Sequence, residues 1–282
     1  MKVLLAEKAG FCYGVRRSID IAFKALNNKD SSNVCSLGPL IHNPQMVEKL
    51  KEQGLEVVEE LEKIDHNTVL IIRSHGVHPE TLKRAQKIAR KVIDATCPFV
   101  KKAQHLTQFL YDEDYLIYIV GEAEHPEVLA LQGFACEQAK VVASASEIKA
   151  INKKSKIGII AQTTQNPKNL AEVSKALSTV TKELRVFNTI CNATLLRQKS
   201  ALKLASTVDI MIVLGGKNSA NTSRLAVLCK QIKETTHHIE TADELKKSWF
   251  KGGEIVGITA GASTPDWIIE ETVLRLKKWF NN

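Results

Sequence analysis

Three of the six cysteines stand in similar local sequences, one in each third of the 282-residue chain. Cys12 lies in GFCYGVRR, Cys97 in DATCPFV and Cys191 in NTICNAT. Each follows a short apolar or small-residue stretch and precedes an amphipathic run, so each is predicted to lie at a strand end and a helix start. The positive end of a helix favours the thiolate form of a cysteine. The pattern therefore indicates three thiolates around one centre.

The spacing alone leaves the identity of that centre open. Three thiolates could hold zinc, with histidine or water as the fourth ligand. They could also hold an iron–sulfur cluster; a cubane cluster usually takes four cysteines, so one iron would remain free to bind something else. No CxxC pair is present, which argues against zinc ribbons and thioredoxin-like sites. Cys35, Cys136 and Cys229 do not share the setting and are interpreted as core or surface residues.

Polar loops supply a second set of candidate groups. Three of these loops carry histidine beside or close to proline, and two offer serine or asparagine at the corresponding place. The free N–H groups of helix starts bind anions, so such loops suit a compact anion such as a diphosphate. Ordinary helix capping is the alternative explanation for each residue taken singly. The candidates are His42, His75, His125, Ser219, Asn221 and Ser263.

A possible proton donor accompanies these loops. Glu127 lies two residues after His125, and an enclosed carboxyl group there would have a raised pKa and could give up a proton. Stabilisation of the first helical turn is the alternative role for Glu127. Thr163, in AQTTQNP, could hydrogen-bond a substrate hydroxyl, and Thr164 beside it is the competing candidate.

A series of apolar strand-length runs, each followed by a polar loop and a helical pattern, organises the chain. Proline stands where the first helical residue is expected at Pro44, Pro79, Pro126, Pro167 and Pro265. With the three cysteine units, the series amounts to nine strand–helix units, three in each third of the chain. The predicted strands are 33–37, 68–72, 115–120, 156–161, 209–214 and 255–259.

The regular spacing predicts an internal threefold repeat rather than one large doubly wound sheet, which is the alternative. The fold class is therefore α/β, with three small α/β domains in a pseudo-threefold arrangement around a central cleft. The predicted domains are 13–96, 97–190 and 191–282, with 1–12 as an N-terminal strand leading to the central site. Ligands of open α/β sheets bind beyond the carboxyl ends of the strands, so the functional loops would meet at one pocket.

Composition restricts the partners. The formal charge is +8, which fits an anionic small substrate or an acidic protein. Aromatic residues are few and no recognition motif for nucleic acid is present, so no nucleic-acid partner is expected, although an RNA-binding protein remains a competing hypothesis. No apolar run reaches the roughly 18 residues of a membrane span, so no membrane partner is expected. The apolar run at the start of the chain is too short for an export signal, so we expect a cytoplasmic protein.

Taken together, the motifs resemble the 4-hydroxy-3-methylbut-2-enyl diphosphate reductase family (the IspH/LytB family) of isoprenoid biosynthesis, over essentially the whole chain. The motifs that carry the resemblance are GFCYGVRR, GPLIHNPQ, IIRSHGV, DATCPFV, GEAEHPEV, AQTTQNP, TICNAT, GGKNSANTSRL and TAGASTPDW. The resemblance implies a two-electron reductive dehydroxylation of the allylic alcohol diphosphate to isopentenyl and dimethylallyl diphosphate.

The resemblance also implies roles for individual residues. One [4Fe–4S] cluster would be held by Cys12, Cys97 and Cys191, with its fourth iron open to the substrate hydroxyl. Glu127 would deliver protons, aided by Thr163 and His125. The diphosphate would be bound by His42, His75, His125, Ser219, Asn221 and Ser263. Thr194 resembles a further pocket residue.

One position departs from the family pattern, and the charge of the chain suggests its partner. The family commonly has two serines in the GGKNSANTS loop, and here Ala220 takes the second position, so one hydroxyl contact is missing and substrate binding is expected to be weaker at most. The electron donor is expected to be a ferredoxin or a flavodoxin, since both are acidic and this chain is basic.

Overall fold

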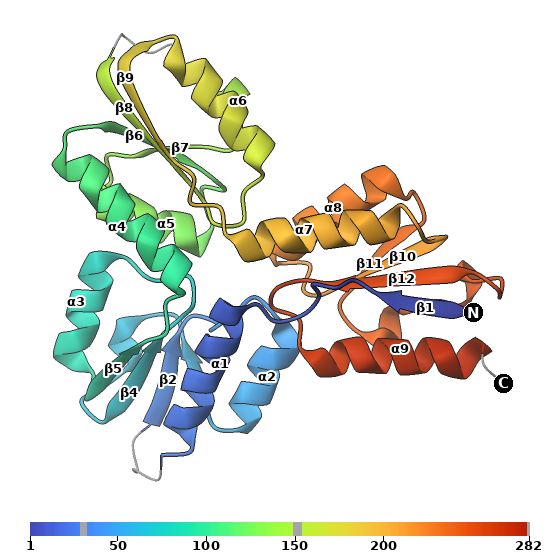
Figure 1. The fold of residues 1–282 in the computed structure, drawn as a ribbon. Coiled ribbons are helices and arrows are strands. Elements are labelled where there is room, and N and C mark those ends of the chain that lie inside the picture. The colour runs from blue at the N-terminus through green and yellow to red at the C-terminus, as the bar shows by residue number, and fades with distance from the viewer. Residues whose placement is uncertain (29–32, 149–153, 281–282) are drawn as a thin grey trace. The chain divides into compact units, whose positions relative to one another are not determined.

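The computed structural model describes residues 1–28, 33–148 and 154–280, and within them the chain forms three four-stranded parallel sheets with flanking helices (Figure 1). One sheet contains β2 (Asn33–Leu37), β3 (Glu56–Val58), β4 (Thr68–Ile72) and β5 (Lys91–Asp94). Another contains β6 (Leu116–Val120), β7 (Lys140–Val142), β8 (Lys154–Ala161) and β9 (Thr181–Phe187). The third contains β1 (Lys2–Leu5), β10 (Ile210–Leu214), β11 (Thr236–Ile239) and β12 (Ile255–Ala260).

Helices connect and cover these strands. The α-helices of the described residues are α1 (Tyr13–Leu26), α2 (Pro44–Glu52), α3 (Pro79–Ile88), α4 (Pro98–Asp112), α5 (Pro126–Phe134), α6 (Pro167–Ser178), α7 (Asn192–Ala205), α8 (Ala220–Ile232) and α9 (Asp266–Phe280). Short 3₁₀ turns lie at Leu61–Lys63, Ala145–Glu147, Ala242–Glu244 and Lys247–Trp249. None of the helices in the described part of the chain has the length and apolar character needed to cross a membrane.

The three sheets share one strand order, which confirms the predicted threefold repeat. The orders are β3-β2-β4-β5, β7-β6-β8-β9 and β11-β10-β12-β1. In the third sheet the N-terminal strand β1 takes the edge position that β5 and β9 hold in the other two. The strand pairings of the described residues are all parallel, so the carboxyl ends of the strands within each sheet meet at one edge. That edge is where the polar loops of each repeat begin.

The strand predictions are confirmed to within two residues at each end. Three strands were not predicted, namely β3, β7 and β11, which are edge strands of three or four residues. Proline begins α2, α3, α5 and α6 as predicted. The prediction for Pro265 is wrong by one residue because α9 begins at Asp266.

The cysteine prediction is confirmed as a matter of local structure. Cys12, Cys97 and Cys191 each stand immediately before the first residue of a helix, namely α1, α4 and α7. The preceding strand is β1, β5 or β9, the edge strand of its own sheet. Each thiol is partly exposed, whereas Cys35 and Cys229 are buried at 2% and 0% exposure and Cys136 is exposed. The last three are the core and surface residues that the sequence predicts.

Each sheet has its own apolar core, made by alternate strand residues and the inner faces of its helices. Leu37, Leu70 and Ile72 contribute to one such cluster. Ile117, Ile119 and Val128 belong to the cluster of the β6–β9 sheet. This separate burial is the physical reason for three small sheets instead of one large one.

Packing divides the chain into two compact units. Unit 1 comprises Met1–Arg16, Ile41–Lys49 and Asn192–Asn282, and it contains the β1-β12-β10-β11 sheet. Unit 2 comprises Arg17–Leu40 and Leu50–Cys191, and it contains the other two sheets. Cys12 therefore belongs to unit 1, and Cys97 and Cys191 belong to unit 2.

Candidate functional site

A buried carboxyl group is the most unusual feature of unit 2. Glu127, in the first turn of α5, has only 2% of its surface exposed. Its Oε1 accepts a hydrogen bond from the backbone N–H of Thr163 at 2.7 Å, and its Oε2 accepts one from Thr163 Oγ1 at 2.8 Å. Burial raises the pKa of Glu127 to about 7, although the two hydrogen bonds from Thr163 act in the opposite direction. The desolvation effect prevails, so the group can carry a proton at neutral pH.

Thr163 connects this carboxyl group to one of the cysteines. The carbonyl oxygen of Thr163 accepts a hydrogen bond from the N–H of Cys191 at 2.9 Å. Thr163 is 6% exposed, and it lies directly after β8, at the carboxyl edge of its sheet. The structure thus brings together Glu127, Thr163 and Cys191, three residues that are far apart in the sequence.

His125 caps the helix that carries Glu127. It is the N-cap residue of α5, and its Nδ1 accepts a hydrogen bond from the Glu127 N–H at 3.1 Å. A neutral imidazole that accepts at Nδ1 carries its proton at Nε2. The cap therefore uses Nδ1 of His125 as the acceptor and is made by the neutral form of the ring that has its proton on Nε2.

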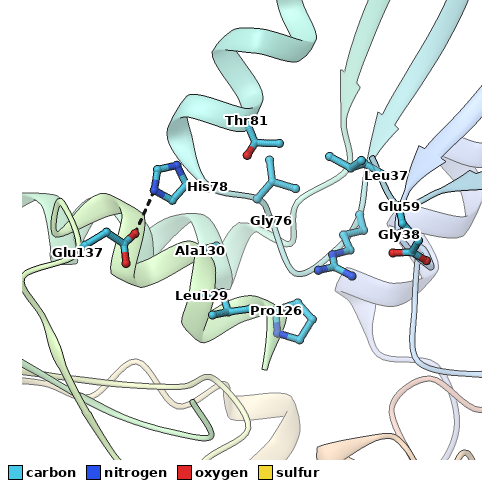
Figure 2. A pocket seen from close by; sticks show the side chains of 12 residues that line it. Leu37, Gly38, Glu59, Gly76, His78, Thr81, Pro126, Leu129, Ala130 and Glu137 are labelled. Atoms are coloured by element: carbon cyan, nitrogen blue, oxygen red, sulfur yellow. Dashed lines mark hydrogen bonds and ion pairs between the residues drawn. The ribbon is translucent and has the colours of Figure 1, made fainter. Parts of the chain in front are cut away.

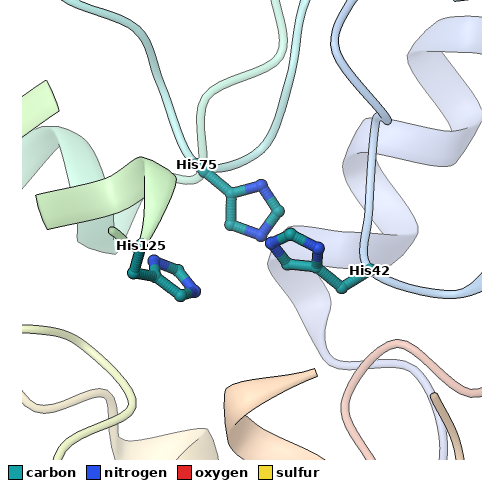
Figure 3. Close-up of side chains that lie close together, drawn as sticks. All are labelled: His42, His75 and His125. Carbon is teal, nitrogen blue, oxygen red and sulfur yellow. The ribbon is translucent and has the colours of Figure 1, made fainter. Parts of the chain in front are cut away.

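His75 lies beside His125. The two rings meet edge to face with their centroids 5.6 Å apart, His75 coming from the loop after β4 and His125 from the start of α5 (Figure 3). The residue before His75, Ser74, accepts a hydrogen bond at its carbonyl oxygen from the N–H of Cys97 at 2.9 Å. A second predicted cysteine is thus attached to a histidine-bearing loop within unit 2.

Unit 1 repeats this attachment for the third cysteine. The N–H of Cys12 donates to the carbonyl oxygen of Ala262 at 3.1 Å, in the loop after β12. The N–H of Val15, in the first turn of α1, donates to Cys12 Sγ at 3.5 Å. Each of the three cysteine amides is thus held by the loop after the strand that pairs with its own edge strand, namely β12, β4 or β8. This shared contact is the structural basis of the repeat at the site.

The predicted anion-binding residues of unit 1 lie on adjoining loops. Ser263, which follows Ala262, donates from Oγ to the carbonyl oxygen of His42 at 2.9 Å. A side chain at Gly216, in the loop after β10, would approach the same His42 carbonyl oxygen to 3.2 Å. Two loops of the β1-β12-β10-β11 sheet therefore pack against the turn that carries His42.

Ser219 and Asn221 occupy the start of α8. Ser219 is the N-cap residue and is 5% exposed, and its Oγ accepts a long hydrogen bond from the Thr222 N–H at 3.4 Å. Its hydroxyl proton is still available for donation, since a hydroxyl group both donates and accepts. Asn221 is 8% exposed, and Ala220 between them is the first helical residue.

Six helix starts of the described residues carry no acidic side chain. α1, α2, α4, α6, α7 and α8 have no acidic residue in the first turn. The partial positive charge of these helix ends is therefore not neutralised by side chains of their own first turn. This arrangement favours anions at these helix starts.

Two further polar groups were not predicted. Arg197 is 4% exposed and donates to the carbonyl oxygen of Gly10 at 2.7 Å, and so fixes the segment before Cys12. Gln162 is fully buried, and its Oε1 accepts from the Glu122 N–H at 3.0 Å, which joins the loop of Thr163 to the loop of His125. The sequence could have indicated both residues through their place inside the motifs NATLLRQ and AQTTQNP, where long polar residues stand among small or apolar ones. Buried polar groups of this kind fix loops in place.

A pocket of about 310 Å³ lies elsewhere in unit 2, between the loop after β4 and the start of α5 (Figure 2). Arg73, Val77 and Leu129 line it, and a hydrogen bond of 3.1 Å between His78 Nε2 and Glu137 lies at its side. None of the predicted site residues lines this pocket. It therefore does not correspond to the predicted diphosphate site.

Comparison with known proteins places the whole chain in one group. The family model described as LytB protein matches residues 3–277. The chain is 49% identical over 282 residues to the 4-hydroxy-3-methylbut-2-enyl diphosphate reductase of Trichlorobacter lovleyi, with 100% of both chains covered. It is 48% identical over 277 residues to the reductase of the same name from Syntrophotalea carbinolica, with 98% of each covered.

Solved structures agree with the sequence comparison. A structure of (E)-4-hydroxy-3-methyl-but-2-enyl diphosphate reductase, described as the terminal enzyme of the non-mevalonate pathway, is 46% identical, with a TM-score of 0.75. The match covers 99% of this chain and 100% of that one. The E-1-hydroxy-2-methyl-but-2-enyl-4-diphosphate reductase of Plasmodium falciparum is 25% identical, with a TM-score of 0.88 over 98% of this chain and 88% of that one.

Proposed function

Since the chain belongs to the LytB protein family, we propose that it reduces (E)-4-hydroxy-3-methylbut-2-enyl diphosphate to isopentenyl diphosphate and dimethylallyl diphosphate. The reaction takes up two electrons and two protons and releases one water, so that a C–O bond breaks and a C–H bond forms. The single observation that carries the assignment to particular residues is the buried Glu127 carboxyl group, hydrogen-bonded twice to Thr163 and attached through Thr163 to Cys191.

The donor set fits a bound iron–sulfur cluster. We propose that one [4Fe–4S] cluster is held by the three cysteines before α1, α4 and α7, whose partly exposed thiols each stand at a helix start. When bound, the cluster supplies the two electrons and a Lewis-acidic iron for the departing hydroxyl group. The ligands in this proposal are Cys12, Cys97 and Cys191.

The proton-donating role belongs to Glu127 and Thr163. When the carboxyl group is ionised, Thr163 Oγ1 donates to it, as the structure shows. When Glu127 is protonated, its O–H can instead donate to Thr163 Oγ1, and the threonine hydroxyl proton then becomes available to a substrate hydroxyl. Glu127 thereby passes a proton through Thr163 to the leaving group. A pKa of about 7 suits this role because both protonation states are accessible at neutral pH.

The diphosphate is bound by neutral donors and helix starts in this proposal. His125 donates from Nε2 because its Nδ1 is occupied by the Glu127 N–H. Ser219 can donate its hydroxyl proton while it caps α8. Because the substrate is short, fixing its charged end also determines where its hydroxyl end lies, so diphosphate binding orients the substrate. The full set comprises His42, His75, His125, Ser219, Asn221 and Ser263.

Three further parts of the proposal concern organisation and partners. The domains are 13–96, 97–190 and 191–282, with 1–12 as the N-terminal strand leading to the central site, and the repeated strand order supports this division. The electron donor is an acidic protein of the ferredoxin or flavodoxin kind. The compartment is the cytoplasm, where thiols are kept reduced and can serve as metal ligands.

The test is anaerobic purification followed by metal analysis and turnover. The expected protein is brown, contains iron, and forms both five-carbon diphosphates from the allylic substrate with reduced methyl viologen as donor. A colourless protein with stoichiometric zinc and no turnover would replace the proposal with a zinc-stabilised anion-binding protein.

A further inference from the structure

One face of α4 remains exposed although its composition is partly apolar. The helix buries the side that carries Val100, Ala103, Thr107 and Leu110. The opposite side presents Phe99, Lys102, His105 and Phe109, spaced three to four residues apart and therefore aligned along the helix. Phe99 is 40% exposed and Phe109 is 38% exposed. We call this stripe the α4 face.

The α4 face begins at a predicted cluster ligand. Cys97 is the N-cap residue of α4, and Phe99 follows it by two positions. Since an α-helix rises about 1.5 Å per residue, Lys102 lies only about 8 Å along the axis from Cys97. An object bound at the first turns of the α4 face would therefore lie close to the Cys97 sulfur.

The same end of α4 is rich in positive charge. Arg17 donates to the carbonyl oxygen of Thr96 at 3.3 Å, next to Cys97. Lys101 pairs with Asp94 at 2.6 Å, which lowers the pKa of that carboxyl group, while Lys102 is exposed. Three cations thus accompany one carboxylate at this end.

Helix stability does not explain Lys102. Cations near a helix N-terminus oppose the helix dipole, and α4 has no acidic residue in its first turn to compensate. Lys101 is explained by its ion pair with Asp94, and the ring of Phe109 packs against Phe187 and Arg185. Phe99 and Lys102, three residues apart on the helix, are both exposed, and a partner that brings negative charge and an apolar contact would match this pair.

We infer that the α4 face, centred on Phe99 and Lys102, is the docking surface for the acidic protein that delivers electrons to the cysteine-bound cluster. The inference rests on the proposed function, because only a reductase that receives electrons one at a time needs such a partner. Transient redox complexes bury small areas and depend on electrostatic steering, which a short aromatic stripe flanked by cations provides. The aromatic ring at the centre supplies the short-range contact.

The experiment uses the anaerobic holoprotein and a flavodoxin of net negative charge as the probe. The variants are Lys102→Glu and Phe99→Ala, and the matched control is Lys175→Glu. Lys175 is an exposed lysine on α6, and α6 covers the opposite face of the β6–β9 sheet (Figure 1). Binding is measured directly by calorimetric titration at two salt concentrations. Turnover is measured with reduced flavodoxin and, separately, with reduced methyl viologen.

The expected result for Lys102→Glu is a fall of about five- to tenfold in flavodoxin affinity and in flavodoxin-driven kcat/KM at low salt, shrinking as salt rises. Phe99→Ala is expected to weaken flavodoxin binding by about fivefold with little salt dependence. Turnover with methyl viologen and the visible spectrum of the cluster stay unchanged in both variants. Lys175→Glu leaves flavodoxin binding within about twofold of the parent.

Two outcomes would overturn the inference. Equal losses with flavodoxin and methyl viologen would mean that the residues act on the cluster instead of on docking. Unchanged flavodoxin affinity in both variants, or an equal loss in Lys175→Glu, would mean that the partner binds elsewhere. Failure of the parent protein to turn over with methyl viologen would contradict the proposed function, and the titration would still decide the docking surface.

Discussion

Replacing Glu127 with glutamine tests the proton-donating role directly. Glutamine has nearly the same shape, and its carbonyl oxygen can still accept one of the two hydrogen bonds from Thr163. It cannot carry an ionisable proton. We expect turnover to fall by about two to four orders of magnitude, the range contributed by a positioned general acid. Iron content and substrate affinity should change little, because no cysteine and no proposed diphosphate donor is altered.

The pH dependence gives a second, independent measure of the same group. Turnover needs the protonated carboxyl group, so kcat in the parent protein should be constant at low pH. It should then decline as pH rises through about 7, the pKa of Glu127. This inflection should be absent from the residual activity of Glu127→Gln.

Stability should respond to pH through the same carboxyl group. Burial raises the pKa of Glu127 from 4.5 to about 7, so the folded state holds a proton that the unfolded state has already lost. The free energy of unfolding contributed by this group is fully present below pH 4.5 and is lost as pH rises to about 7. The loss corresponds to roughly 3 kcal/mol. Glu127→Gln should not show it.

The stability assay compares the two proteins at pH 5 and pH 8 under anaerobic conditions. The hydrogen bond lost from Thr163 affects the variant equally at both pH values. Subtracting the pH-dependent change in unfolding free energy of the variant from that of the parent therefore isolates the ionisation of Glu127. Glu124→Gln is the matched control, because Glu124 lies in the same loop and is exposed. Near-parent turnover of Glu127→Gln, or a pH profile that it shares with the parent, would refute the assignment.

Three other substitutions have defined outcomes. Thr163→Val should reduce turnover by about a hundredfold while Thr163→Ser stays within a few-fold, because only serine keeps the hydroxyl that relays the proton; equal activities would argue against the relay. Cys97→Ser should lose iron and visible absorbance, whereas Cys35→Ala should keep both, since burial raises the pKa of the Cys35 thiol to about 11 and leaves it a poor ligand; metal analysis decides. His125→Asn should keep the melting temperature, because asparagine can still cap α5, but should raise KM by about tenfold. His125→Ala should lower both stability and substrate affinity. A KM unchanged in both variants would exclude His125 from substrate binding.

The fold could be predicted largely from apolar runs and prolines. β4 matches its predicted bounds because its Val-, Leu- and Ile-rich run TVLII, with polar residues on both sides, determines a buried parallel strand, and the less apolar β2, NVCSL, also matches its predicted bounds. β3, β7 and β11 could not be predicted, because a three- or four-residue edge strand such as Glu56–Val58 is held by pairing with a neighbour and not by its own composition. Their existence depends on the sheet, which is a tertiary property.

The candidate site could be predicted in part, and its limits have a physical cause. The local pattern around Cys12, Cys97 and Cys191 indicated helix starts, and the structure has them there. The motifs also indicated Glu127 and Thr163, but not that both carboxylate oxygens are bound by one threonine. That contact joins two loops separated by 36 residues, so only the folded chain defines it.

The repeated attachment of each cysteine to its neighbouring loop explains how three small sheets can serve one reaction. The N–H of each cysteine donates a hydrogen bond to the loop after β12, β4 or β8, and this bond fixes the loop relative to the thiol. The same contact occurs for Cys12, Cys97 and Cys191. In the β6–β9 sheet the loop that bonds Cys191 is also the loop that supplies Thr163. In the sheet of β1 the corresponding loop carries Ser263, and in the sheet of β4 it carries His75. Under the proposed function, the repeat links each proposed cluster ligand to a loop with a proposed role, proton relay for one loop and diphosphate binding for the other two, and loss of one cysteine should disturb that loop as well as cluster binding.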